Sequence, residues 1–277
     1  MMLKSFPGIT GILVLTAILL LLQTFLGRLA LVLVRTSGDF WGSNWGAGFF
    51  TLIAFGLTLS LGLSFSKNRN PEKLTTLLAF QPARARFAFL FWGIVLAAFG
   101  GGFVLGEISD VVSHIWPISL SYQEVFKRLV PAQPQLGTVF LLGIVAPLTE
   151  ETLFRGFFFH GTSRRYGPGP AVFLTSAVFA LAHMNPWQAS AAFLAGFYLS
   201  WLVQRSGSLF PSILAHGLYN LFPVLLAWSG QIIGGYNDLP GQTSNEPLPW
   251  MFLGLISLFF GLFLTSKSFH GVSDKST

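Results

Sequence analysis

The sequence predicts an all-α protein, a polytopic membrane helix bundle of about eight transmembrane helices with both termini cytoplasmic. Three observations indicate this class: the composition, the spacing of apolar windows and the distribution of basic residues. Of the 277 residues, 52% are hydrophobic and only 9% are charged, whereas soluble domains carry about 25% charged residues. So few charges could not cover the surface of a soluble protein, so we expect a multi-pass protein of the bacterial cytoplasmic membrane.

Apolar windows near the ~20 residues needed to cross a bilayer define the expected helices. They fall at 8–27, 46–66, 87–106, 136–159, 171–186, 189–204, 209–228 and 249–266. Pro186 nearly joins the fifth window to the sixth, and Pro211 and Pro223 are expected to interrupt the seventh. The first window exceeds a signal-peptide core of about 7–15 residues and has no convincing cleavage site, which favours a retained first span.

Basic residues divide unequally between the two sides of this predicted topology. The expected cytoplasmic segments hold Lys4, Lys67, Arg69, Lys73, Arg84, Arg86, Arg164, Arg165, Arg205, Lys267 and Lys275, and the expected outer loops hold Arg28, Arg35, Lys127 and Arg128. This asymmetry is the one that the positive-inside rule describes. The net charge of +6 is therefore assigned to contact with anionic lipid, and no nucleic-acid partner is expected.

The chain divides into three parts by this reading. Residues 1–135 hold the first three transmembrane helices, a basic cytoplasmic connector and an outer loop; residues 136–228 hold the fourth to seventh helices; residues 229–277 hold an outer loop, the last helix and a polar tail. The absence of cysteine excludes disulfides, thiolate nucleophiles and Cys-ligated metals.

Charged residues stand inside the fourth window, in the segment PLTEETLFR from Pro147 to Arg155. A charge at the centre of a membrane helix costs roughly 2.5–3.5 kcal/mol on insertion scales, so this segment is a candidate functional site. On a helix, Glu151 and Arg155 are four residues apart and face each other. Glu150 lies about 100° round the helix and has no partner within the motif, as a general base requires.

Two histidines and an asparagine stand on other predicted helices. His183 closes FALAH, with Phe179 one turn earlier, and His216 opens HGLYN, which places Asn220 on the same helical stripe. Ionisable residues inside a membrane usually face the bundle interior, so we expect these groups to converge with Glu150. The remaining histidines, His114, His160 and His270, are interpreted as exposed or interfacial.

A converged set of this kind suits hydrolysis by activated water. Glu150 would take the proton from water with help from His183, while His216 and Asn220 would donate hydrogen bonds to an oxyanion. A Zn²⁺ site with Glu150, His183 and His216 as ligands and an open water position is equally compatible. No nucleotide or organic cofactor is expected, since the chain has neither a Walker A lysine nor a Rossmann glycine pattern.

Three motifs resemble those of a known family. EExxFR at Glu150–Arg155, FxxxH at Phe179–His183 and HxxxN at His216–Asn220 are similar to the motifs of the CPBP family, the CAAX-protease and bacteriocin-processing (Abi) intramembrane proteases. The resemblance covers roughly 136–228. It implies a CAAX-type intramembrane endopeptidase, a metalloprotease if zinc is bound, acting on a peptide or protein substrate that is prenylated or membrane-embedded.

The same resemblance implies roles for the motif residues. Glu150 is the base, Glu151 and Arg155 are a supporting ion pair, and His183, His216 and Asn220 complete the site. Signatures of other intramembrane proteases, HExxH, GxGD and GxSG, are absent from the sequence.

Two other functions use the same buried polar cluster. A membrane carrier would use it as a proton relay and would be expected to show internal repeats, which we do not find. A non-catalytic immunity or scaffold protein would need Glu150 only for packing.

Overall fold

A computed structural model describes residues 7–66, 78–234, 236–237 and 247–270, and within these ranges the chain forms helices and no strand. The long helices are α1 (Ile9–Ser37), α2 (Asn44–Phe65), α4 (Phe87–Ile115), the continuous helix Leu136–Tyr166, α9 (Pro168–Ala182), α10 (Pro186–Ser206), α11 (Phe210–Trp228) and α12 (Leu248–Ser268). Short helices are η1 (Asp39–Gly42) and α5 (Leu120–Leu129). The predicted all-α bundle with a helix at each of the eight apolar windows is confirmed.

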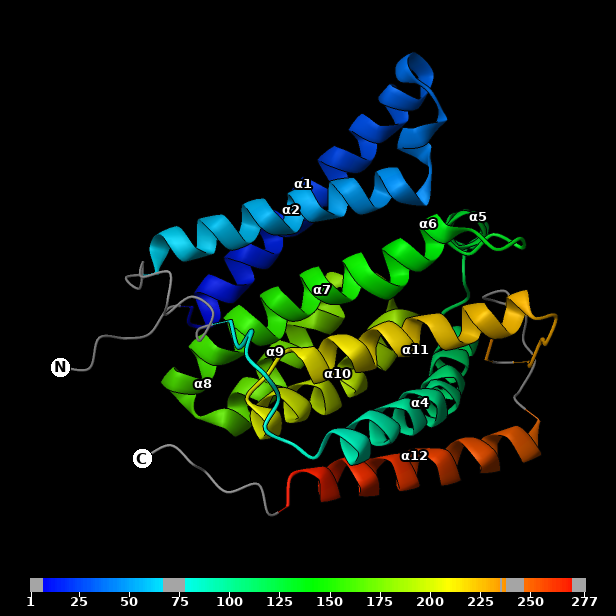
Figure 1. The fold of residues 1–277 in the computed structure, drawn as a ribbon. Coiled ribbons are helices and arrows are strands. Elements are labelled where there is room, and N and C mark those ends of the chain that lie inside the picture. The colour runs from blue at the N-terminus through cyan, green and yellow to red at the C-terminus, as the bar shows by residue number, and fades with distance from the viewer. Residues whose placement is uncertain (1–6, 67–77, 235, 238–246, 271–277) are drawn as a thin grey trace.

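The helices form three groups in space (Figure 1). The hairpin of α1 and α2 lies on one side, α4 and α12 lie together on the opposite side, and Leu136–Tyr166 lies between them with α9, α10 and α11. Helix α1 begins at the same end of the bundle at which α12 ends (Figure 1), as an even number of membrane crossings requires.

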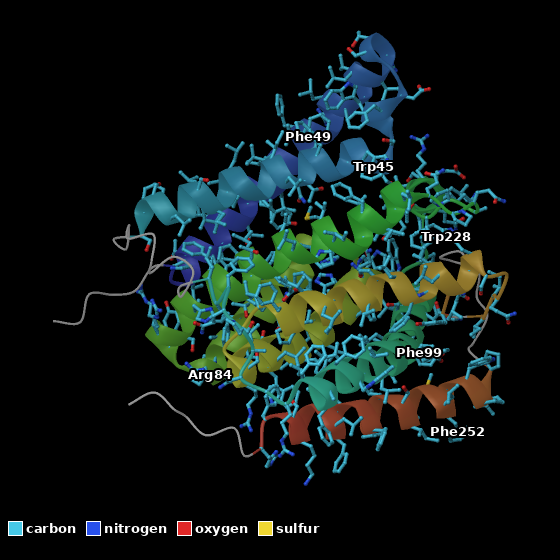
Figure 2. All side chains as sticks on the ribbon, viewed as in Figure 1. Trp45, Phe49, Arg84, Phe99, Trp228 and Phe252 are labelled. Atoms are coloured by element: carbon cyan, nitrogen blue, oxygen red, sulfur yellow. The ribbon has the colours of Figure 1, made fainter. Side chains whose placement is uncertain are left out.

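Hydrogen bonds connect loops and helix ends at each end of the bundle. At one end the backbone N–H groups of Arg84 and Arg86 donate to the carbonyls of Ser206 and Ser268. At the other end the indole of Trp228 donates to a backbone carbonyl of the segment before Leu136. Figure 2 shows Arg84 and Trp228 at these opposite ends. Several basic residues predicted to be cytoplasmic (Lys4, Lys67, Arg69, Lys73 and Lys275) lie outside the described residues.

Apolar side chains cover the outside of the bundle, and the charges of Glu151 and Arg155 lie within it. Phe25, Ile256 and Phe259 are more than half exposed, and Phe252 projects from the outer side of α12 (Figure 2), whereas Glu151 and Arg155 are fully buried. Among the described residues, six helices are long and apolar enough to cross a membrane, namely α1, α2, α4, Leu136–Tyr166, α11 and α12; α9 is apolar and shorter. The protein is a multi-pass integral membrane protein.

Prolines mark helix starts as well as interiors. Pro186 and Pro211 lie in the first turns of α10 and α11, and Pro223 lies inside α11. The expectation that Pro211 interrupts its helix is therefore wrong, because the first turn has no intrahelical acceptor for its N–H and tolerates proline.

Glycines bring α4 and α12 into backbone contact. A Cβ added at Gly261 would collide with the backbone nitrogen of Ala97, and one at Gly100 with the carbonyl of Gly254. Small residues of this kind replace the hydrophobic effect as the means of joining helices in lipid, because they permit close van der Waals packing.

Gly261→Ala should therefore lower the thermal stability of the protein in detergent. The added methyl group meets main-chain atoms that cannot rotate away, and such overpacking costs about 1–3 kcal/mol. Gly56→Ala is the matched control, since a Cβ at Gly56 in α2 meets nothing within 4 Å, and it should be neutral or stabilising by up to about 1 kcal/mol. Equal melting temperatures for the two variants would contradict this packing.

Candidate active site

The charged motif lies in the middle of the helix Leu136–Tyr166. Glu150 and Glu151 end the α-helical piece α7 (Ala146–Glu151), which lies between two π-helical pieces, η2 (Val139–Val145) and η3 (Thr152–Phe159). The helix begins with α6 (Leu136–Thr138) and ends with α8 (His160–Tyr166). Such π segments often mark functional sites in helices.

Pro147 explains part of this irregularity. At the end of η2 the N–H of Ala146 donates to the carbonyl of Leu141, five residues back. The next such bond would run from residue 147 to Leu142, and proline has no N–H to make it. The side-chain amide of Asn220 on α11 donates to this Leu142 carbonyl at 3.0 Å, so Asn220 replaces the missing donor.

Glu151 accepts two hydrogen bonds from different helices. Its Oε1 receives Arg155 Nη1 at 2.9 Å and His216 Nδ1 at 2.9 Å. Glu151 and Arg155 are 0% exposed, and His216 is also buried. The expected pairing within the motif is present, and the partnership of Glu151 with His216 was not anticipated from the sequence.

Glu150 differs from its neighbour in both exposure and partners. Its side chain is 21% exposed, and no described residue makes a hydrogen bond to its Oε2. This oxygen is itself buried and lies 3.8 Å from His216 Nε2. The structure therefore brings Glu150, Glu151, Arg155 and His216 into one cluster.

His183 and Asn220 join this cluster through a shared cavity of about 320 Å³. His183 caps α9, where its Nδ1 lies 2.9 Å from the carbonyl of Phe179. Because a carbonyl only accepts, this Nδ1 carries the proton and leaves Nε2 as a lone pair. His183, His216 and Asn220 all line the cavity, whose other walls are mainly apolar residues of α4, α10 and α12.

Phe179 is the residue that the sequence reasoning did not nominate for the site. Its ring lies under the guanidinium of Arg155, with Cζ 4.2 Å from the ring centroid. The same ring makes perpendicular contacts with the imidazoles of His183 and His216. The signal was its position one turn before His183 on the same helical face.

The residues proposed as zinc ligands are not arranged as a ligand set. Among the described residues no group of three His, Cys, Asp or Glu side chains could hold a metal ion. Glu150, His183 and His216 as placed do not form a three-ligand zinc site.

Arg155→Met should destabilise the protein by about 3–5 kcal/mol, because it leaves the buried Glu151 carboxylate without a counter-charge. The double variant Glu151→Gln, Arg155→Met should be more stable than this single variant, since it removes both charges while residue 151 keeps a carbonyl oxygen for His216. Thermal unfolding in detergent, followed by tryptophan fluorescence, compares the three proteins. A single variant as stable as the wild type would refute the role of the pair.

Asn220→Ala should cost about 1–3 kcal/mol by leaving the Leu142 carbonyl unsatisfied. Pro147→Ala restores a main-chain N–H that can reach this carbonyl. It should therefore stabilise the Asn220→Ala protein by more than it stabilises the wild type. A double-mutant cycle of melting temperatures measures the difference, and equal gains in the two backgrounds would rule out the compensation.

Comparison with known proteins finds similarity in the part of the chain that holds this site. Residues 132–222 match the family model of type II CAAX prenyl endopeptidase Rce1-like proteins. The UPF0177 protein YxdF of Lactococcus lactis subsp. lactis (strain IL1403) is 30% identical over 90 residues, which is 32% of this chain and 49% of YxdF. The match thus spans about half the length of that relative, and no solved structure matches the chain. The segment 132–222, which carries all the site residues named above, is thus similar to the Rce1-like CAAX prenyl endopeptidase family.

Proposed function

We propose that this chain is a CAAX-type intramembrane endopeptidase that hydrolyses a peptide bond with water activated by Glu150. The observation that carries the proposal is the contrast between two adjacent carboxylates. Glu151 is buried and bonded to Arg155 and His216, whereas Glu150 is partly exposed and keeps an oxygen without a described partner beside an imidazole. The family match of residues 132–222 supports the same activity.

Glu150 is the general base in this proposal. Water bound beside the partly exposed Glu150 side chain gives a proton to the carboxylate as the water oxygen attacks the carbonyl carbon of the scissile bond. The Nε2 lone pair of His183 accepts the second hydrogen of this water and so orients it. When the tetrahedral intermediate breaks down, the proton on Glu150 passes to the departing amine.

Two side chains of α11, Asn220 and His216, would stabilise the oxyanion by donating hydrogen bonds. One amide hydrogen of Asn220 is used on the Leu142 carbonyl, and the other is free to donate into the cavity that Asn220 lines. His216, held at Nδ1 by Glu151, donates from Nε2 when that nitrogen is protonated. Donors fixed in advance in a site of low dielectric stabilise developing charge strongly.

The cavity bears on the class of substrate. Its walls include small residues of α4 and α10 such as Ala97, Gly101 and Ala195, which leave an apolar space beside the imidazoles. An apolar group next to the scissile bond would fit there, as in a prenylated or membrane-embedded peptide or protein. Membrane lipid surrounds the bundle.

Glu150→Gln should lower kcat about 10²–10⁴-fold, the usual contribution of a general base. The melting temperature should change little, because Glu150 is not the partner of Arg155. The substrate is an internally quenched fluorescent peptide with an S-farnesylated cysteine three residues before its C-terminus, presented in detergent micelles. Glu124→Gln is the control, since Glu124 lies exposed on α5 and pairs only with the neighbouring Lys127 among the ion pairs of the described residues.

Each result separates one part of the proposal from the rest. Wild-type activity in Glu150→Gln would remove its role as base. Cleavage of the same peptide without the farnesyl group at an equal rate would remove the CAAX specificity and keep the protease. Loss of activity with a chelator, restored by Zn²⁺, would replace the metal-free mechanism. A wild type that cleaves no peptide would favour a carrier or a scaffold.

A further inference from the structure

We propose that Phe179 is a positioning residue, whose ring holds the Arg155 guanidinium by its face and fixes the orientation of both site imidazoles. The inference rests on the proposed function, because it assigns a new member to that site. Phe179 is not itself given a step in the chemistry. It acts through Arg155, His183 and His216.

The buried Arg155 guanidinium needs stabilisation beyond its ion pair with Glu151. The side chain is fully buried, yet only Nη1 makes a hydrogen bond, to Glu151, and Nε and Nη2 find no acceptor among the described residues. A buried cation left partly unsatisfied is costly. The negatively polarised face of an aromatic ring is a further source of stabilisation for a cation at this position.

The ring of Phe179 is placed to supply it. Arg155 Cζ lies 4.2 Å from the ring centroid, well inside the ~6 Å within which cation–π attraction operates. The other cation–ring pairs in the described part of the chain are longer, from 5.4 to 5.8 Å. Those pairs use side chains near the helix ends, whereas this contact lies among buried groups where such attraction is strongest.

The same ring also contacts the two imidazoles and restrains their orientation. It lies 4.9 Å from the His183 ring at 89° and 5.8 Å from the His216 ring at 83°. Perpendicular arrangements at such distances are favoured pairs for aromatic rings. In addition, the main-chain carbonyl of Phe179 receives His183 Nδ1, so one residue restrains His183 from two directions.

Phe179 is itself immobilised. It is 2% exposed, and its ring packs edge-on against that of Phe154 at 5.1 Å and an interplanar angle of 67°. A displacement of Arg155 would carry Glu151 with it, and Glu151 holds Nδ1 of His216. Loss of the ring face should therefore disturb His216 through two routes, directly and through the ion pair.

The test replaces Phe179 by mono-, di- and trifluorophenylalanine. Fluorine withdraws electron density from the ring face with little change in ring size, so a side chain needed only for packing would not respond. We expect the melting temperature and kcat on the farnesylated peptide to fall stepwise, with kcat about tenfold lower for the trifluoro ring and a smaller change in KM. A flat series would overturn the proposal.

The control series places the same rings at position 158. Phe158 is also fully buried in the same apolar cluster, and its ring contacts are with Phe154 and Phe157. Neither melting temperature nor kcat should depend on fluorination there. Phe179→Tyr should retain activity and Phe179→Leu should lose it. A fully active Phe179→Leu protein would also overturn the proposal.

A measurement without substrate separates this inference from the proposed function. Imidazole ¹⁵N resonances of His183 and His216 should shift in the protein with trifluorophenylalanine at position 179 and stay in place with it at position 158. If the wild type fails to cleave the peptide but these shifts occur, the proposed function falls and the positioning role stands. If cleavage occurs but neither the resonances nor kcat respond, the positioning role falls.

Discussion

The buried ion pair of Glu151 and Arg155 is the interaction on which the rest of the site depends. Two charges removed from water are tolerated only when each has a partner and good geometry. This pair also recruits His216, whose Nδ1 bonds to the oxygen that Arg155 contacts. Because Glu151 meets this demand for neutralisation, its neighbour Glu150 is left with an oxygen that no described residue bonds. Adjacent residues of one type thus take opposite environments.

The irregular helix that carries this pair also explains how α11 approaches it. A Cβ on Gly217 would lie 2.7 Å from the carbonyl oxygen of Gly143, so only glycine permits this spacing between the helices. The same crossing places Asn220 on the carbonyl that Pro147 leaves without a donor. His216 directly precedes Gly217, so the close approach of the two helices at Gly217 brings its imidazole within hydrogen-bonding distance of Glu151. The close crossing and the π-helical turns are two aspects of one arrangement.

Some of this could be predicted from the sequence because it depends on spacing within a single helix. The apolar windows identified every long helix, and the four-residue spacing of Glu151 and Arg155 gave their pairing. The π-helical pieces could not be predicted, since Pro147 in an apolar run indicates only some disturbance of the helix. The contact of His216 with Glu151, and the position of Phe179 between three helices, depend on how deeply the helices cross. Crossing depth is set by packing of small residues, which periodicity does not report.

A hydrolytic site inside a membrane must admit water to one group and keep it from another. The structure separates these demands over a single peptide bond: Glu150 is partly exposed, and Glu151 is completely buried. The dry side is closed by aromatic rings, of which Phe179 contacts the cation and both imidazoles. Both imidazoles also line a cavity whose walls include alanine and glycine as well as larger apolar residues. The two neighbouring carboxylates therefore differ in exposure and in partners, and this difference is what the proposed division between a structural charge and a general base requires.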